Sequence, residues 1–321
     1  MIGKVSPADL AQFVLSRTGV DDPSVVMGPT YGEDTAAIDL GDQILVVNAD
    51  PISLAVDRIG TIGVNVVAND VAASGAQPRW LTDVIFLPDD DPDVLDSITR
   101  QLDEEATRVG VSIVGGHAEY APELSRPVLS LTCFGLTDRY VSSAGAQPGD
   151  LILLTRAAGI EGTGILASDF GEELADVVAA DSLDSARRFT GEVGVVDAAL
   201  AIREFATAMH DPTEGGVLAG LVEMAIAADA TFEVERDRIP VRPETVELCA
   251  AVDVDPLRIF GSGALLATIS PDDRDGVFDA LHEIDVPVAV VGQVTDGEAG
   301  VVLGDERYRE PVRDDLYELW E

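Results

Sequence analysis

Acidic residues outnumber basic residues almost threefold in this chain of 321 residues, with 59 Asp and Glu against 20 Lys and Arg and a formal net charge of −39. Lys4 is the one lysine among the basic residues. A charge of this size repels itself in a compact fold, and molar salt shortens the screening length to about 3 Å. The sequence therefore predicts a halophilic protein that folds in concentrated salt, with an ordinary acidic protein as the alternative.

The composition also excludes several functional classes. An acidic chain without a basic patch repels nucleic acid, so we expect no nucleic-acid partner. No apolar run approaches the roughly 18 residues of a membrane helix, and residues 1–10 lack the apolar segment of a signal peptide. Cys133 and Cys249 stand in apolar stretches and are expected to be buried thiols. These features predict a cytoplasmic protein without membrane contact.

The length suits two domains of roughly 150 residues each. A polar segment at 142–150 marks the predicted boundary, which gives domains 1–148 and 149–321. Predicted helices lie at 7–18, 58–75, 92–109, 193–209 and 216–228, and predicted strands at 43–47, 80–87, 111–114, 127–136 and 151–155. Because helices and strands are mixed without strict alternation, the expected fold class is α+β (mixed α/β).

Three aspartates of the first half follow glycine or apolar segments. Asp34 comes shortly after Gly32, Asp50 stands at the end of a predicted strand, and Asp70 lies beside Asn69 within the predicted helix 58–75. Each could be an ordinary solvated position. If they converge, however, their charges repel one another unless a divalent cation lies between them. Magnesium prefers oxygen ligands and usually shares them with phosphates, so the three acids form a candidate Mg–ATP site.

Glycine-rich segments provide a second set of candidates. Gly115 and Gly116 follow a strand that we predict to be buried, and paired glycines allow close approach of a ligand to the main chain. His117 follows them and could equally be a surface histidine. Gly162 belongs to the segment 158–164, which opens a predicted helix whose amides could bind phosphate.

The segment His210-Asp211-Pro212-Thr213-Glu214-Gly215-Gly216 is predicted to end one helix and begin the next. We expect Thr213 to cap the second helix and Gly215 and Gly216 to admit a ligand. The alternative is an ordinary corner between two helices.

Eight segments occur in a characteristic order: GEDTAAI, NAD, NVVANDVAASGAQP, VGGHAE, GAQPGDLILLT, AGIEGT, HDPTEGG and GSGALL. In that order they resemble the PurM-like superfamily, which includes AIR synthetase, thiamine-monophosphate kinase, selenophosphate synthetase and HypE. The chain is most similar to HypE-like, AIR synthase-related proteins, in a haloarchaeal-type version. Each motif alone is weak evidence, whereas eight in order cover nearly the whole chain.

The resemblance implies an N-terminal ATP- and Mg²⁺-binding domain that forms a β-barrel across a homodimer, followed by a C-terminal α/β sandwich. It implies that Asp34, Asp50 and Asp70 bind Mg²⁺, and that Asp70, His210 and Asp211 take part in catalysis. The implied nucleotide-binding residues are Gly32, Asp34, Asp50, Asn69, Gly115, Gly116, Gly162, Thr213, Gly215 and Gly216. The implied activity is the ATP-dependent activation of an oxygen of a small substrate by phosphoryl transfer. A non-catalytic nucleotide-binding or scaffold protein and a thiamine-monophosphate kinase-like enzyme are the alternatives.

The chain also departs from its relatives. It ends in Leu319-Trp320-Glu321, without the C-terminal cysteine of HypE, and no cysteine precedes Cys133, unlike selenophosphate synthetases. His117 stands where some relatives have Asp, so Glu119 is the alternative ligand there. The motifs leave the substrate open.

Overall fold

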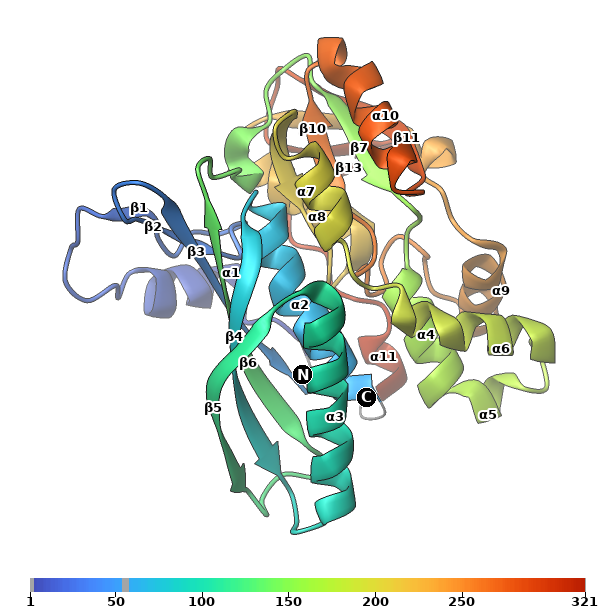
Figure 1. The fold of residues 1–321 in the computed structure, drawn as a ribbon. Coiled ribbons are helices and arrows are strands. Elements are labelled where there is room, and N and C mark those ends of the chain that lie inside the picture. The colour runs from blue at the N-terminus through green and yellow to red at the C-terminus, as the bar shows by residue number, and fades with distance from the viewer. Residues whose placement is uncertain (1–2, 54–57, 321) are drawn as a thin grey trace. The chain divides into compact units, whose positions relative to one another are not determined.

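The computed structural model describes residues 3–53 and 58–320, which form two compact units (Figure 1). The smaller unit comprises residues 24–28 and 34–140, and the larger unit comprises the chain up to residue 23, residues 29–33 and the chain from residue 141 onward. Each unit contains one mixed β-sheet with helices, so the predicted mixed α/β class and the two-part organisation are confirmed. The domain boundary after residue 148 stays a prediction.

The smaller unit has a six-stranded sheet in the order β1-β2-β3-β6-β4-β5. Neighbouring strands are antiparallel, except that β4 and β5 are parallel and are joined through a helix. The strands are β1 (Val25–Met27), β2 (Ala36–Asp39), β3 (Ile44–Ile52), β4 (Gln77–Leu87), β5 (Ser112–Tyr120) and β6 (Val128–Thr137).

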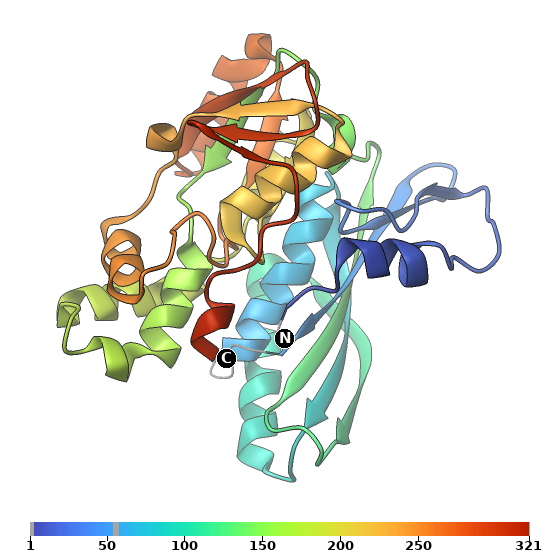
Figure 2. The same ribbon diagram turned by 180° about the vertical axis from the view of Figure 1, so that it is seen from behind.

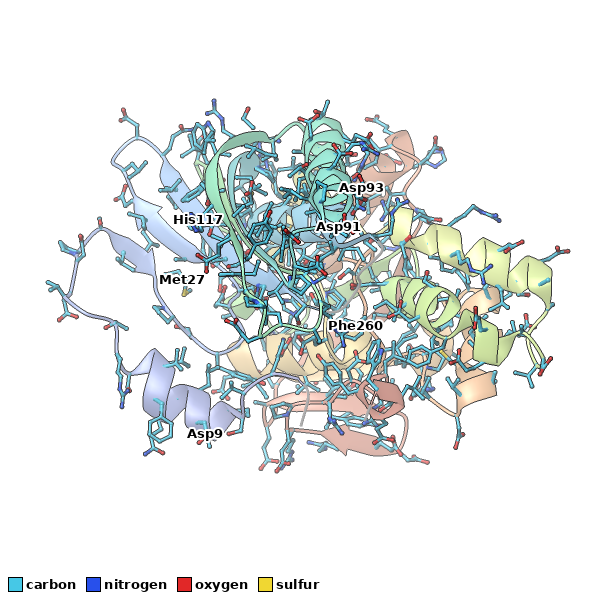
Figure 3. The ribbon with its side chains drawn as sticks, turned by 90° about the horizontal axis from the view of Figure 1, so that it is seen from below. Asp9, Met27, Asp91, Asp93, His117 and Phe260 are labelled. Carbon is cyan, nitrogen blue, oxygen red and sulfur yellow. The ribbon has the colours of Figure 1, made fainter. Side chains whose placement is uncertain are left out.

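Helices α2 (Ile59–Ala73) and α3 (Pro92–Val109) lie on one face of this sheet (Figures 1 and 2). Asp91 caps α3 and Gly110 ends it in the left-handed conformation, as Pro92 and Gly110 predict. Figure 3 shows Asp91 and Asp93 at the start of α3. The Arg108 guanidinium of α3 donates to Asn65 Oδ1 of α2 at 3.0 Å, which ties the two helices together.

Alternate residues of β6 face α2. Leu131 lies so close to Gly63 that a Cβ on this glycine would be 2.6 Å from its side chain, and Val71 approaches Gly135 in the same way. The intervening residues, among them Phe134 and Leu136, are half-buried on the opposite face. This period of two fixes the register, so that even-numbered residues of the adjacent strand β3 also face α2.

The prediction of a short buried strand at 111–114 is wrong in length and in burial. Strand β5 extends to Tyr120, and every one of its residues is exposed. It is the outermost strand of the sheet and pairs with β4 along one edge. Its apolar residues, such as Val114 at 58% exposure, resemble those of a buried strand in sequence. The local pattern does not distinguish an unpaired edge strand from an internal one.

The larger unit has a seven-stranded sheet in the order β13-β12-β9-β11-β7-β10-β8. Strands β9 and β12 are parallel, and the other neighbours are antiparallel. The strands are β7 (Leu151–Thr155), β8 (Ala206–His210), β9 (Thr231–Val234), β10 (Leu266–Ile269), β11 (Val288–Thr295), β12 (Gly300–Leu303) and β13 (Glu306–Tyr308).

Helices of the larger unit connect and flank these strands. The α-helices are α1 (Pro7–Asp9), α4 (Ile160–Asp169), α5 (Gly171–Leu174), α6 (Ala180–Arg187), α7 (Val196–Ile202), α8 (Gly216–Ala227), α9 (Pro243–Val252), α10 (Arg274–Glu283) and α11 (Tyr317–Trp320). The π-helical turn η1 spans Leu10–Leu15, and the 3₁₀ turns are η3 (Ser143–Gly145), η4 (Arg188–Gly191), η5 (Arg236–Arg238) and η6 (Pro271–Asp273).

Helix α8 forms the core of the larger unit with the sheet. Its apolar side chains, including Leu218, Leu221 and Val222, belong to one buried cluster with Leu154, Phe232 and other strand residues. Cys133 and Cys249 are buried free thiols, as predicted. Over the described ranges 3–53 and 58–320, no helix is long and apolar enough to cross a membrane.

The predicted helix at 193–209 is wrong. The segment divides into α7 and strand β8, which pairs with β10 so that Met209 lies opposite Ala267. Residues 206–209, Ala-Thr-Ala-Met, are short and apolar, so their local preference does not decide between helix and strand. Pairing with a neighbouring strand decides the conformation. His210 is therefore the last residue of a strand rather than of a helix.

Candidate functional site

Strand β3 presents two polar side chains to the face that α2 covers. Asn48 is buried and Asp50, two residues further on, is half-buried. The Asn48 amide group donates from Nδ2 to Asp50 Oδ2 and to the main-chain oxygen of Asp34, both at 3.0 Å. Asn48 Oδ1 is buried and has no hydrogen-bond partner among the described residues. Sequence reasoning missed Asn48, although its spacing from Asp50 places both on one face.

Asp34 and Asp70 lie close together in the smaller unit. Asp70 projects from α2 and is 5% exposed, whereas Asp34 is exposed just before β2. One carboxylate oxygen of each lies within 4.8 Å of the other. Thr35 Oγ1 shares a hydrogen bond of 2.7 Å with Ser74 Oγ, next to the end of α2, which fixes the segment that carries Asp34. Asn69 is fully buried on α2.

This donor set fits a hard divalent cation. The carboxylates of Asp34 and Asp70 repel each other at this separation unless a cation or proton compensates them. The candidate donors are all oxygen atoms, which suits Mg²⁺. Asn48 Oδ1 is a further buried oxygen atom, and no hydrogen-bond donor among the described residues binds it. Asp50 is joined to Asn48 by the hydrogen bond from Nδ2, and its part in a cation site stays a prediction.

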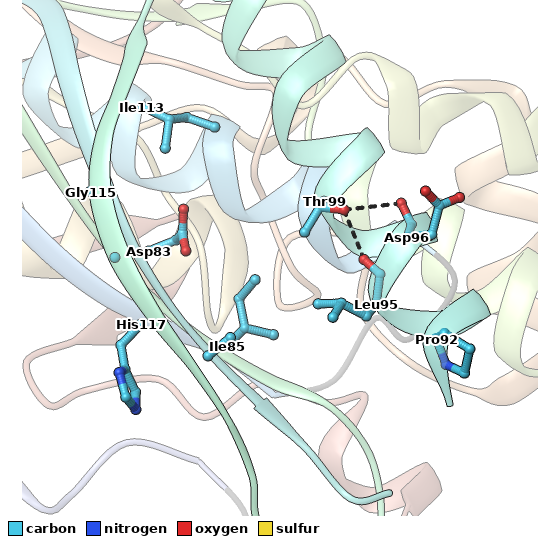
Figure 4. Close-up of a pocket in the computed structure, with 11 residues that line it drawn as sticks. Asp83, Ile85, Pro92, Leu95, Asp96, Thr99, Ile113, Gly115 and His117 are labelled. Carbon is cyan, nitrogen blue, oxygen red and sulfur yellow. Dashed lines mark hydrogen bonds between the residues drawn. The ribbon is translucent and has the colours of Figure 1, made fainter. Parts of the chain in front are cut away.

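Gly115 and Gly116 lie on the exposed strand β5. A Cβ on Gly116 would be 2.3 Å from the main-chain oxygen of Asp83, so only glycine fits there. The Asp83 carboxyl group faces a groove of about 630 Å³ between the strands and α3, and burial raises its pKa (Figure 4). His117 points away from α3 and forms an exposed pair with Glu119, Nε2 to Oε2 at 3.1 Å.

Gly32 belongs to the larger unit. Its φ is +85°, and a Cβ would lie 3.2 Å from the main-chain oxygen of Glu223 on α8. The neighbouring Glu33 accepts hydrogen bonds from the Ser142 hydroxyl and from the amide of Ala144. Gly32 therefore allows this segment to lie directly against α8.

The turn that follows β8 holds two buried polar residues. His210 is 4% exposed and Asp211 is 2% exposed. His210 Nε2 lies 3.1 Å from Glu223 Oε2, a residue that sequence reasoning did not identify. Glu223 lies on α8, 13 residues from His210 in the sequence, so no local pattern links the two residues.

The N-cap of α8 is Gly215, and the prediction that Thr213 caps this helix is wrong. Thr213 accepts, through its main-chain oxygen, the amides of Gly216 at 3.1 Å and Gly261 at 2.9 Å. Gly215 and Gly216 have φ values of +77° and +65°. A Cβ on Gly216 would be 2.5 Å from the main-chain oxygen of Ile259. These glycines let neighbouring main-chain segments meet.

Gly162 lies in the first turn of α4, as the sequence predicts for this segment. Its amide donates to the main-chain oxygen of Phe260 at 2.9 Å, and a Cβ would be 2.9 Å from the Ile259 side chain. The amide of Gly162 is therefore occupied within the protein. Gly159, the N-cap, has a φ of +70°.

Two further buried carboxyl groups lie near these segments in the larger unit. Burial raises the pKa of Glu161 to about 7; the neighbouring Ser262 opposes this rise and the charge of Glu214 adds to it. Burial raises the pKa of Asp314 to about 8, partly offset by the amides of Gly215 and Leu316, which it accepts at 2.8 and 3.0 Å. Neither group was identified from the sequence.

The fold and the oxygen-donor cluster define a two-part α/β protein with a candidate cation site beside α2. Residues 32–137 match the family model for the N-terminal domain of AIR synthase related proteins, and residues 147–305 match the model for the C-terminal domain. The chain is 30% identical to selenide, water dikinase from Geobacter sp. (strain M21) over 91% of this chain and 92% of that protein. The chain therefore belongs to the AIR synthase related, PurM-like family, as the order of its motifs predicts.

Two other similarities extend this result. The chain is 26% identical to carbamoyl dehydratase HypE from Rhizobium leguminosarum bv. viciae, over 82% of this chain and 77% of that protein. Its structure superposes on a hydrogenase maturation protein HypE in complex with ATP with a TM-score of 0.71 and 25% identity, covering 98% and 97% of the two chains.

Proposed function

We propose that this chain is an ATP-dependent enzyme that transfers the terminal phosphoryl group of Mg–ATP to an oxygen of a small substrate. The observation that carries the proposal is the pair of carboxylates, Asp34 and Asp70, together with the buried amide group of Asn48, which contacts the Asp34 main chain and whose Oδ1 has no hydrogen-bond partner among the described residues. The similarity to a HypE structure with bound ATP supports the same conclusion.

In this proposal Asp34, Asp50 and Asp70 hold Mg²⁺, with the Asn48 oxygen as a further ligand. The cation would neutralise phosphate charge and orient the nucleotide for in-line transfer. Asn48 keeps Asp50 and the Asp34 main chain in place through its two hydrogen bonds. Placing a charged side chain inside the fold is costly without such a role, and Asp70 is almost completely buried.

His210 and Asp211 are the groups that we propose to act on the phosphoryl acceptor. Both are buried: His210 is the last residue of β8, at one edge of the larger sheet, and Asp211 follows it. A histidine can accept or donate a proton near neutral pH. Thr213, Gly215 and Gly216 form the turn that carries them, while Gly32, Asn69, Gly115, Gly116 and Gly162 remain proposed nucleotide-binding positions.

We further propose that the protein works as a homodimer in a salt-rich cytoplasm. The face of the smaller sheet away from α2 and α3 carries half-buried apolar residues, including Val47 opposite Phe134 and Leu45 opposite Leu136. Strand β5 has an unpaired edge among the described residues, and such edges favour pairing with another chain. A barrel formed with a second copy would cover both. Light scattering in molar KCl should then give twice the 33.7 kDa chain mass, and a monomer would contradict the barrel.

Basal ATP hydrolysis tests the proposed activity. The wild-type protein should hydrolyse ATP with MgCl₂, and Asp70→Asn should lose most of this activity because one cation ligand is removed. Asp42→Asn, in the exposed turn between β2 and β3, is the matched control and should behave as wild type. ATP binding without hydrolysis in the wild type would favour the non-catalytic alternative.

A further inference from the structure

The one lysine of the chain occupies a defined place on the larger unit. Lys4 Nζ lies 3.2 Å from Glu223 Oε1 on α8. The preceding Gly3 has a φ of +118°, and a Cβ on it would be 2.8 Å from the ring of Tyr317. The first described residues and the C-terminal end of the described chain lie close together in both ribbon views (Figures 1 and 2). Because only glycine allows this close approach, the path that brings Lys4 to Glu223 is built into the fold.

The second oxygen of the same carboxylate contacts His210. Glu223 Oε2 lies 3.1 Å from His210 Nε2, and the two side chains are 14% and 4% exposed. Gly220, on the same helix, allows the His210 ring to lie against the α8 main chain, since a Cβ there would be 3.0 Å from His210 Cδ2. One carboxylate thus connects the N-terminal segment to a buried histidine.

The side chain of Glu223 is mostly buried, so its contacts affect the stability of the fold. An exposed ion pair contributes little to stability, but a carboxylate that is mostly buried needs donors to offset its lost hydration. Lys4 and His210 supply one donor to each oxygen. Removing Lys4 leaves one oxygen without this partner and changes the field at the other, which holds His210.

The composition points to a role that arginine does not fill. The other 19 basic residues are all arginine. An ammonium is a compact point charge on a flexible stem, whereas a guanidinium is a planar fork. At Glu223, His210 contacts Oε2 and Lys4 contacts Oε1, which is a contact that a single-point donor can make.

We infer that Glu223 is a positioning residue that holds the His210 imidazole in one orientation, and that Lys4 completes this arrangement by docking the N-terminal segment on the same carboxylate. The catalytic meaning of the inference rests on the proposed function, in which His210 acts on the phosphoryl acceptor. The physical arrangement itself does not depend on that function. The competing explanation is that Lys4 only fastens the chain terminus.

Nitrogen NMR of histidine side chains tests the arrangement without any activity. The chain has three histidines, so selective ¹⁵N labelling gives few signals, and His210 is assigned by its loss in His210→Gln. At fixed pH and molar KCl, Glu223→Gln and Lys4→Gln should both shift the His210 ring signals. Lys4→Arg keeps the charge but replaces the single-point donor by a planar fork, so it should restore them only in part. Glu235→Gln, which removes the exposed pair with Arg238, is the control. His210 signals unchanged in Glu223→Gln and Lys4→Gln would overturn the inference.

Turnover provides the second measurement. Glu223→Gln should lower the rate of ATP hydrolysis at saturating ATP by about tenfold or more, with a much smaller change in the KM for ATP and an unchanged far-UV circular dichroism spectrum. A rate equal to the wild type overturns the positioning role. Absence of ATP hydrolysis in the wild type, together with the expected NMR shifts, would instead reject the proposed function and leave the arrangement supported.

Discussion

Glu161 offers a quantitative test of the packing in the larger unit. Its side chain is 4% exposed, and burial raises its pKa from 4.5 to about 7. Below pH 4.5 the carboxyl group is protonated in both the folded and the unfolded chain, so it carries no penalty. Between 4.5 and about 7 the unfolded chain loses this proton first, so stability falls as pH rises. One pKa unit corresponds to about 1.4 kcal/mol, which gives a total penalty of about 3 kcal/mol.

Glu161→Gln removes the ionisation and keeps the shape. Relative to the wild type, the free energy of unfolding of this variant should therefore increase by about 3 kcal/mol between pH 4.5 and about pH 8. Urea unfolding at constant molar KCl measures this difference, and any packing cost of the substitution is the same at both pH values. Glu172→Gln, on the exposed side of α5, is the control. A difference between Glu161→Gln and the wild type that does not change with pH would refute the reasoning.

Two further predictions concern stability. The melting temperature of the wild type should rise steeply with KCl from dilute buffer to molar concentration, because a net charge of −39 repels itself less when screened; a flat or falling melting temperature would refute the halophilic interpretation. Gly216→Ala should destabilise the protein by more than about 2 kcal/mol in urea unfolding, since φ is +65° and a Cβ would lie 2.5 Å from the Ile259 oxygen. Gly191→Ala, where a Cβ meets nothing within 4 Å, should cost much less, and equal losses would contradict the strain.

The sequence predicts features that arise locally. Helix α3 begins at Pro92 and ends before Gly110 as expected, because capping is a property of neighbouring residues. The eight ordered motifs likewise predict the family. The conformation of residues 206–210 is different, since strand β8 depends on pairing with β10, which is distant in the chain. The exposure of β5 follows from its position at the sheet edge and not from its composition.

The same distinction applies to the candidate site. Asp34 and Asp70 are found in the sequence through their motifs, and the structure places their carboxylates within 4.8 Å. Asn48 has a local signal, because its spacing of two residues from Asp50 places both side chains on one face of β3. Glu161 and Glu223 have none, because their importance comes from burial and from contacts made across the fold. Sequence patterns do not identify polar residues whose importance comes from their burial in the fold.

We propose that Asp34, Asp50 and Asp70 hold magnesium for ATP. Calorimetry of ATP binding in MgCl₂ tests it most directly, on the wild type and on the Asn variant of each acid. Loss of one ligand should weaken binding by roughly ten- to a hundredfold, or about 1.4–3 kcal/mol, and EDTA should weaken the wild type at least as much. The control Asp42→Asn should bind as the wild type does. Binding that is indifferent to EDTA, or an equal loss in Asp42→Asn, would contradict the magnesium site.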